Sequence, residues 1–270
     1  MLINTPGLRS FRPGHVNICC ANLAAEGEAT IQAKAVMDKP RASSPQPIAS
    51  RIHTVILLVI IFAGSWIGAI RAPRLRSHGV QHLAISYLVM MAIDGLMTAY
   101  VVAGVRRHGG SLRDLVGGRW GRPADFFRDL LLAFGFWIVS ILCLAIVRLG
   151  MHAKTSIDAI RFLVPQSRAE AILWIFVALT AGFCEEIIFR GYLQRQFIAL
   201  SGLPAVGILF SAVIFGGSHA YQGAKQTVIL GAYGAMFGVL AYWRRSLRPG
   251  MMAHAGQDAL AGLLIRLLPK

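Results

Sequence analysis

Residues 171–190 read AILWIFVALTAGFCEEIIFR, an uncharged run that ends in two adjacent glutamates and an arginine. A membrane span needs about 20 mostly apolar residues, so the run is long enough to form most of one. Charged side chains inside a bilayer are costly unless they are paired or wetted. The stretch therefore predicts a transmembrane helix, over 171–189, that carries Glu185 and Glu186 near its end.

The rest of the chain has the same apolar character. Of its 270 residues 56% are hydrophobic and 14% charged, whereas about a quarter of the residues in a soluble domain are charged. Further apolar runs lie at 54–70, 83–105, 130–147, 203–220, 226–243 and 249–265, and a half-span at 157–164 is left open. We predict an all-α, polytopic transmembrane bundle of about seven spans, or eight with the half-span, divided into N-terminal helices in 51–165 and a helical core in 166–270.

The N-terminal 50 residues differ from the rest. They mix Pro, Ser, Ala and Asn with scattered charge and hold no apolar run, which predicts a disordered tail. Met37 lies just ahead of the first span, so residues 1–36 are open to being an artefact of start-site choice.

The net charge of +15 comes from Lys and Arg that lie between the apolar runs. Such residues act as topology signals and contact anionic lipid, so no nucleic-acid partner is expected. The loops on the same side of the membrane as the N-terminus hold more of the Lys and Arg residues than the loops on the opposite side. Because cytoplasmic loops carry the excess of positive charge, this predicts a cytoplasmic N-terminus.

Ionisable residues are few in the last spans. Glu186 and Arg190 are four residues apart, so on a helix they share a face and pair. Glu185 lies about 100° around the helix from Glu186 and has no partner nearby in the sequence. It is our first choice for activating water, against the alternative that both glutamates only cap a helix end at the interface.

Two later spans carry polar residues at the same spacing. Phe215 and His219 are four residues apart, as are His254 and Asp258, so three helices can aim polar groups at one point. Such side chains either activate water and hold an oxyanion or ligate a divalent metal such as zinc. A packing role is the plainer alternative for a lone histidine. Between these spans, Gly234 and Gly238 form a GxxxG step, which predicts close helix packing around the site rather than dimerisation.

In this order the residues resemble a known family, the type II CAAX prenyl protease and bacteriocin-processing family, also called CPBP or Abi intramembrane peptidases. The resemblance covers residues 170–262. It rests on three motifs, EExxxR, FxxxH and an HxxxN-like element, matched by Glu185, Glu186 and Arg190, by Phe215 and His219, and by His254 and Asp258.

The resemblance implies an intramembrane endopeptidase that cuts a peptide bond near the membrane interface, with residues 166–270 as its catalytic core. Glu185 and His219 would activate water, supported by the ion pair of Glu186. His254 and position 258 would bind the developing negative charge. It also implies a peptide or membrane-protein substrate, multi-pass insertion in the lipid bilayer and a bacterial plasma (inner) membrane.

The chain departs from the family pattern at Asp258, where the family has Asn. An amide donates to an oxyanion and an ionised carboxylate repels it, so either Asp258 is protonated or its role differs: it orients His254 or joins a metal site. No cofactor follows from the sequence and zinc is left open, although the absence of HExxH disfavours a metallopeptidase.

Other functions remain open. A non-catalytic bacteriocin-immunity or interaction protein on the same membrane scaffold is the main alternative. Ser218, in GGSH, offers a serine nucleophile, and a transporter would use Asp94 with the two glutamates as a proton relay. Asp94 has no basic residue near it in the sequence, so we expect its partner on another helix, outside the motif region.

Overall fold

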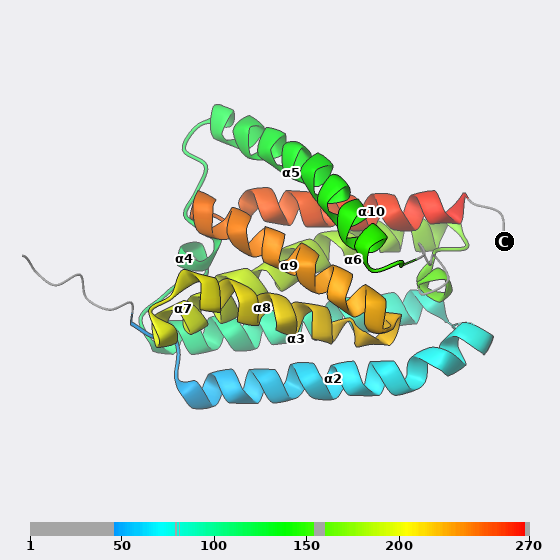
Figure 1. The fold of residues 1–270 in the computed structure, drawn as a ribbon, viewed down its shortest axis with the longest axis horizontal. Helices are drawn as coiled ribbons and strands as arrows, with labels where there is room; N and C mark the ends of the chain where they lie inside the picture. The colour runs from blue at the N-terminus through cyan, green and yellow to red at the C-terminus, as the bar shows by residue number, and fades with distance from the viewer. Residues whose placement is uncertain (1–45, 79, 81, 154–159, 268–270) are drawn as a thin grey trace, which may run out of the picture. The chain divides into compact units, whose positions relative to one another are not determined.

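The computed structural model describes residues 46–78, 80, 82–153 and 160–267, and over these ranges the chain is helical, with no strand. The bundle is built from these elements (Figure 1): α2 (Arg51–His78), α3 (Leu83–Arg107), α4 (Leu112–Val116), α5 (Pro123–Gly150), α6 (Arg168–Glu185), the π-helix η3 (Glu186–Gln194), α7 (Arg195–Ser201), α8 (Pro204–Ser218), α9 (Ala224–Arg244) and α10 (Arg248–Arg266). Two short 3-10 turns are η2 (Arg161–Leu163) and η4 (Ala220–Gln222).

The predicted tail, including residues 1–36 and Met37, lies outside the described residues except for its last five. The half-span at 157–164 is described only from residue 160, where it forms a bend and the short turn η2.

Five helices are long and apolar enough to cross a membrane: α2, α3, α5, the continuous helix Arg168–Ser201, and α9. The all-helical, multi-pass prediction is therefore confirmed. Helix α8 is apolar but has only 15 residues, and α10 carries the polar residues of the last motif. The count of seven spans stays a prediction.

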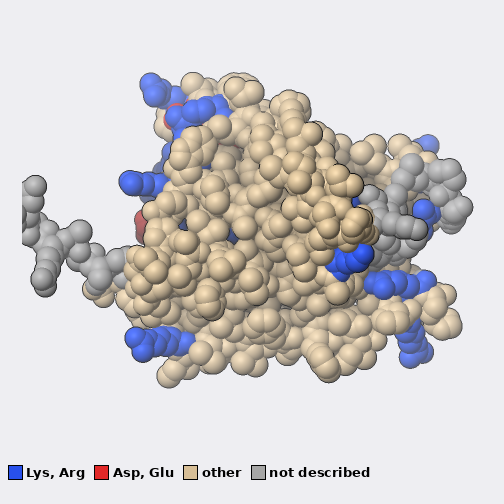
Figure 2. Space-filling model, viewed as in Figure 1, with Lys and Arg blue, Asp and Glu red and all other residues tan. Residues whose placement is uncertain are grey.

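The surface of the bundle is suited to lipid. Figure 2 shows Lys and Arg gathered toward the two ends of the molecule, with an uncharged zone between them. Large apolar side chains of the long helices α2 and α5 are exposed, among them Trp66 (70% exposed), Leu131 (71%) and Ile146 (71%). In water such exposure would be unfavourable, whereas in a bilayer these side chains face lipid.

The span that carries the glutamates is longer than predicted. Instead of ending near Phe189, the helix continues through η3 and α7 to Ser201, so Glu185 lies near its middle. Residues 190–202, which separate the predicted spans 171–189 and 203–220 and would form a loop between them, are therefore largely helical. The helix continues because Arg190 and Gln194 are buried and bonded inside the bundle, which removes their need to reach water.

A nine-residue π-helix is uncommon, because π turns usually occur singly and often at functional sites. On one side η3 is held by α2. Tyr192 Oη lies 2.8 Å from Nδ1 of His53 and 2.9 Å from Oγ1 of Thr54. Just after η3, in α7, Nε2 of Gln196 donates to the carbonyl of Ala49, which precedes α2, at 2.8 Å.

On the other side η3 is held by α9. Arg190 donates to the carbonyl of Gly234 at 3.1 Å, and Gln194 donates to the carbonyl of Gly238 at 2.9 Å. A Cβ at Gly238 would lie 2.7 Å from Oε1 of Gln194. The prediction that the GxxxG step packs helices around the site is confirmed: the glycines let polar side chains of η3 reach the backbone of α9.

Candidate active site

The site forms where α6 and α10 come into close contact. A Cβ on Gly182 would lie 2.7 Å from the backbone nitrogen of Ala255 and 2.9 Å from its Cα, so only glycine allows this approach. Gly182 is one turn before Glu185, and Ala255 follows His254. The close approach therefore brings the first and third motifs together.

Glu186 and Arg190 form the predicted ion pair. Nη1 of Arg190 lies 2.9 Å from Oε1 of Glu186, and both side chains are at most 1% exposed. The guanidinium also lies over two aromatic rings, 4.3 Å from the centroid of Phe215 and 5.0 Å from that of Phe237, where cation–π attraction adds to the pairing. These contacts fix Glu186 in place.

His254 lies between three carboxylates. Its Nδ1 lies 3.2 Å from Oε1 of Glu186, and its Nε2 lies 3.8 Å from Oε2 of Glu185 and 3.6 Å from Oδ2 of Asp258. Nδ1 is placed to donate a hydrogen bond to Glu186, and Nε2 lies within ion-pair distance of the other two carboxylates. The geometry favours a cationic imidazolium at the centre of the site.

The acids differ in accessibility. The side chain of Glu186 is 1% exposed, those of Glu185 and Asp258 are 19% and 36% exposed. Within the described part of the chain, Oε2 of Glu185 and Oε2 of Glu186 are both buried with no hydrogen-bond partner. Glu186 is enclosed in its ion pair, while the side chains of Glu185 and Asp258 are partly exposed and lie on the Nε2 side of His254.

His219 lies at the end of α8, on the predicted face with Phe215. Its ring centroid is 4.8 Å from that of Phe215, and its Nδ1 lies 2.9 Å from the Phe215 carbonyl. A carbonyl only accepts, so Nδ1 carries the proton and Nε2 is the basic nitrogen. His219 interacts electrostatically with His254 and Asp258; among the described contacts none joins it directly to Glu185.

Asp94 lies on α3, where it is partly buried. Among the described contacts no hydrogen bond or ion pair involves its side chain, so the expectation that its partner lies on another helix, outside the motif region, stays a prediction. An acid in mid-span without a basic partner is a functional candidate by default.

Whether the site could bind zinc depends on how its possible metal ligands are arranged. In the residues that the structure describes, no three His, Cys, Asp or Glu side chains are grouped to hold a metal ion. Glu185, Glu186 and Asp258 are arranged around the ring of His254 rather than around a common point. The residues present do not fit a zinc site.

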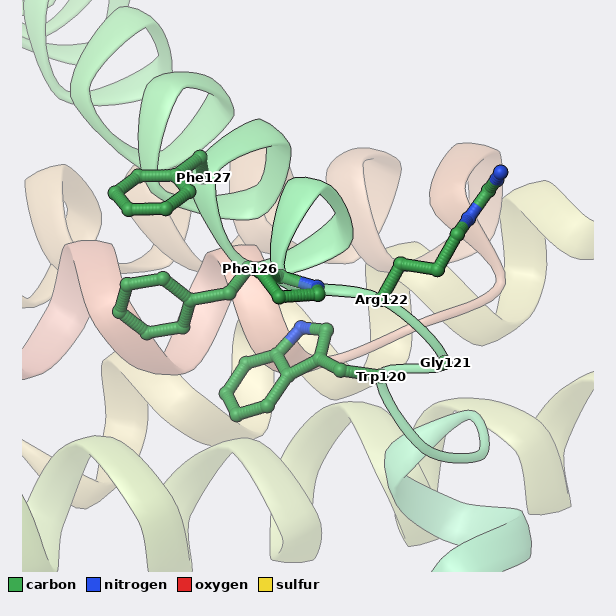
Figure 3. Close-up of a pocket in the computed structure, with 6 residues that line it drawn as sticks. Trp120, Gly121, Arg122, Phe126 and Phe127 are labelled. Carbon is green, nitrogen blue, oxygen red and sulfur yellow. The ribbon is translucent and has the colours of Figure 1, made fainter.

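A surface pocket lies elsewhere on the molecule. Figure 3 shows it at the start of α5, where the rings of Trp120, Phe126 and Phe127 lie beside the backbone of the turn through Gly121 and Arg122. None of the motif residues lines it. Aromatic and arginine side chains at the end of a span are typical of a membrane–water interface.

Together the fold and the site define a class: a polytopic helical membrane protein whose core buries a charged cluster of glutamate, arginine and histidine. Residues 167–260 match the family model described as "Type II CAAX prenyl endopeptidase Rce1-like". The family recognised from the three motifs is thereby confirmed, and this segment carries the domain of an intramembrane CAAX-type protease family. No curated protein and no solved structure matches the chain significantly.

Proposed function

We propose that the protein is an intramembrane endopeptidase that hydrolyses a peptide bond near the membrane interface, using water activated by Glu185. The observation that carries the proposal is the contrast between the two adjacent glutamates. Glu186 is buried in its ion pair with Arg190, whereas the side chain of Glu185 is 19% exposed and lies, like Asp258, on the Nε2 side of His254.

The reaction follows from these positions. Glu185 takes a proton from water as its oxygen attacks the carbonyl carbon of the substrate, and the proton passes to the nitrogen of the departing amine as the C–N bond breaks. His219 offers its basic Nε2 as a second acceptor for this water. The negative charge that develops on the carbonyl oxygen is stabilised by the imidazolium of His254.

Asp258 takes the orienting role in this scheme. It lies 3.6 Å from Nε2 of His254, one helical turn further along α10. A carboxylate there stabilises the imidazolium and holds its ring, which accounts for an acid where the family has an amide. No step needs a metal ion.

For the substrate and the location of the protein, the proposal follows the sequence. The substrate is a peptide or membrane protein, and recognition of a prenyl group is not part of the proposal. We place the protein in a plasma membrane with a cytoplasmic N-terminus. That orientation now rests on loops other than 190–202, since those residues lie largely in a helix.

The test compares the purified wild type with Glu185→Gln on a library of membrane-proximal peptides. Glutamine keeps the shape but cannot take the proton, so we expect the variant to lose about 100-fold or more in kcat. Glu170→Gln is the matched control: Glu170 lies on the same helix, and glutamine preserves the capping motif that Glu170 forms with Ser167.

A zinc chelator distinguishes the metal-free mechanism from a zinc-dependent one. Cleavage that persists in the chelator and fails in Glu185→Gln is the expected result. Cleavage that stops in the chelator and returns with zinc would overturn the metal-free scheme. Full activity of Glu185→Gln would refute the role of Glu185, and a wild type that binds peptides without cleaving any would favour the non-catalytic immunity or interaction protein.

A further inference from the structure

One end of the bundle is rich in arginine. The segments 106–129 and 244–248 hold nine Arg and three Asp, and the backbone nitrogen of Leu247 donates to the carbonyl of Val116 at 2.9 Å, which joins the two segments. Figure 1 shows α4, the start of α5, the end of α9 and the start of α10 at this end, and Figure 2 shows basic side chains gathered there. The proposed active site uses none of these arginines.

Asp129 lies at the centre of this region, and its side chain is fully buried in the first turns of α5. Its Oδ2 accepts a hydrogen bond from Nε1 of Trp120 at 2.9 Å and lies 3.2 Å from Nε of Arg248. Its Oδ1 lies 3.4 Å from Nη2 of Arg244 and 4.0 Å from Nε of Arg128. One carboxylate thus gathers guanidinium groups from α5, α9 and α10 around one point.

Positive charge is in excess at this point. The four arginines around Asp129 and the start of α5, here called the arginine cluster, are Arg122, Arg128, Arg244 and Arg248. Two carboxylates accompany them, Asp129 and Asp125, and Asp125 lies 3.5 Å from Nη2 of Arg128. Four cations with two anions leave a surplus of two positive charges, which an added anion would offset.

The protein does not saturate the donors of the arginine cluster. Among the described residues, Nε of Arg244 and Nη1 of Arg248 are buried without a hydrogen-bond partner, although buried polar groups normally have one. The side chains of Arg244 and Arg248 are partly exposed, and Arg122 and Arg128 are exposed. The arginine cluster is therefore accessible to an anion from outside the protein.

The aromatic pocket at the start of α5 adjoins the arginine cluster. Its walls include the rings of Trp120, Phe126 and Phe127, and Figure 3 shows the side chain of Arg122 extending away from these rings. The guanidinium of Arg248 lies 5.3 Å from the centroid of the Trp120 ring, so Trp120 borders both the pocket and the cluster. Arginines beside aromatic rings at the start of a span lie at the level of the lipid headgroups.

From this arrangement we infer that the arginine cluster and the aromatic pocket form a binding site for the headgroup of an anionic phospholipid. The phosphate oxygens accept hydrogen bonds from the guanidinium groups, whose planar fork matches phosphate. The aromatic rings contact the glycerol and the adjoining part of an acyl chain. A lipid with net negative charge offsets the surplus positive charge, whereas a zwitterionic lipid offsets none of it.

The bound lipid has a consequence for stability. Because its phosphate contacts arginines at the start of α5, the end of α9 and the start of α10, it stabilises the packing of these three helices. The inference does not depend on the proposed peptidase chemistry.

Thermal unfolding of the full chain in detergent tests the inference. A ligand that binds only the folded state raises the Tm, so phosphatidylglycerol at ten times its Kd should raise it by about 3–6 °C. Phosphatidylcholine or inorganic phosphate at the same concentration should shift the Tm by about 1 °C or less.

Two double variants with the same change in net charge locate the site. Arg122→Gln combined with Arg128→Gln removes two exposed cations of the arginine cluster, and the protein should fold with a Tm near that of the wild type in the absence of lipid. Its Kd for phosphatidylglycerol should rise about 20- to 30-fold, since each arginine near a lipid surface contributes about fivefold.

The matched control combines Arg71→Gln with Arg74→Gln. Both arginines are exposed in the C-terminal part of α2, which Figure 1 shows at the opposite end of the bundle from α4. Charges that far from the site are screened by salt, so the Kd should stay within about twofold of the wild-type value.

Four results would overturn the inference. An unchanged Tm with phosphatidylglycerol would show that it does not bind, and equal shifts with phosphatidylcholine would show binding without selection for charge. An equal rise of the Kd in both double variants would indicate attraction to the net charge of the protein rather than a site. An equal shift with inorganic phosphate would assign the arginine cluster to free phosphate instead of lipid.

Discussion

Replacing Arg190 by methionine is expected to cause one of the largest losses of stability in the bundle. The substitution removes the 2.9 Å ion pair with Glu186, the 3.1 Å hydrogen bond to the Gly234 carbonyl and the contact of the guanidinium with the ring of Phe215 at 4.3 Å. It leaves a carboxylate at most 1% exposed. Breaking a buried ion pair in this way costs about 3–5 kcal/mol. His254 still donates to Glu186, which favours the lower end of that range.

Thermal unfolding in detergent measures the loss. For a chain of this size 1 kcal/mol corresponds to roughly 2–4 °C, so Arg190→Met should lower the Tm by on the order of 10 °C. Arg128→Met is the control, because Arg128 is 53% exposed in its 3.5 Å ion pair with Asp125 and such pairs contribute about 1 kcal/mol or less.

A double variant tests whether the lost stability reflects an unpaired charge. Apolar replacement of both members of a buried pair is often neutral, so Glu186→Met combined with Arg190→Met should regain much of the Tm that Arg190→Met loses. The reasoning is wrong if Arg190→Met melts like Arg128→Met, or if the double variant is no more stable than Arg190→Met alone.

Three further substitutions probe the packing and chemistry of the site. Gly182→Ala should reduce peptide cleavage and lower stability by about 1–3 kcal/mol, because its Cβ would lie 2.7 Å from the backbone nitrogen of Ala255 and force α10 away from α6; wild-type cleavage would show that the close approach is not needed. Gln194→Leu should cost about 0.5–1.5 kcal/mol in stability, since it removes the buried 2.9 Å hydrogen bond to the Gly238 carbonyl, and an unchanged Tm would contradict this. Ser218→Ala should keep cleavage, because Ser218 donates to the Phe215 carbonyl at 2.7 Å; a folded but inactive variant would instead indicate a serine nucleophile.

Much of the fold follows from local properties of the sequence. Each of the seven apolar runs coincides with a helix, because an uncharged run can satisfy its backbone in lipid only by internal hydrogen bonds. The pairing of Glu186 with Arg190 could also be predicted from the local sequence, because a spacing of four residues puts both side chains on one face of a helix. The spacing survives even though this stretch is a π-helix.

Helix ends were harder to predict where charges are buried. The span with the glutamates was predicted to end at Phe189, but the helix continues and Arg190 lies inside the bundle, where Glu186 and the Gly234 carbonyl bind it. Whether an arginine is in water or in a protein interior depends on partners that are distant in sequence, and no local pattern reports them.

The sequence by itself therefore determined the membrane class, the helices and the set of polar residues that three helices bring together, because these follow from hydrophobicity and helical period. Only the tertiary structure decided that His254 lies between Glu185, Glu186 and Asp258, and that the side chain of Glu186 is buried while that of Glu185 is partly exposed. The physical reason is that these relations depend on which helices pack together and how closely, and a single glycine, Gly182, sets the distance between the two helices that carry most of the site.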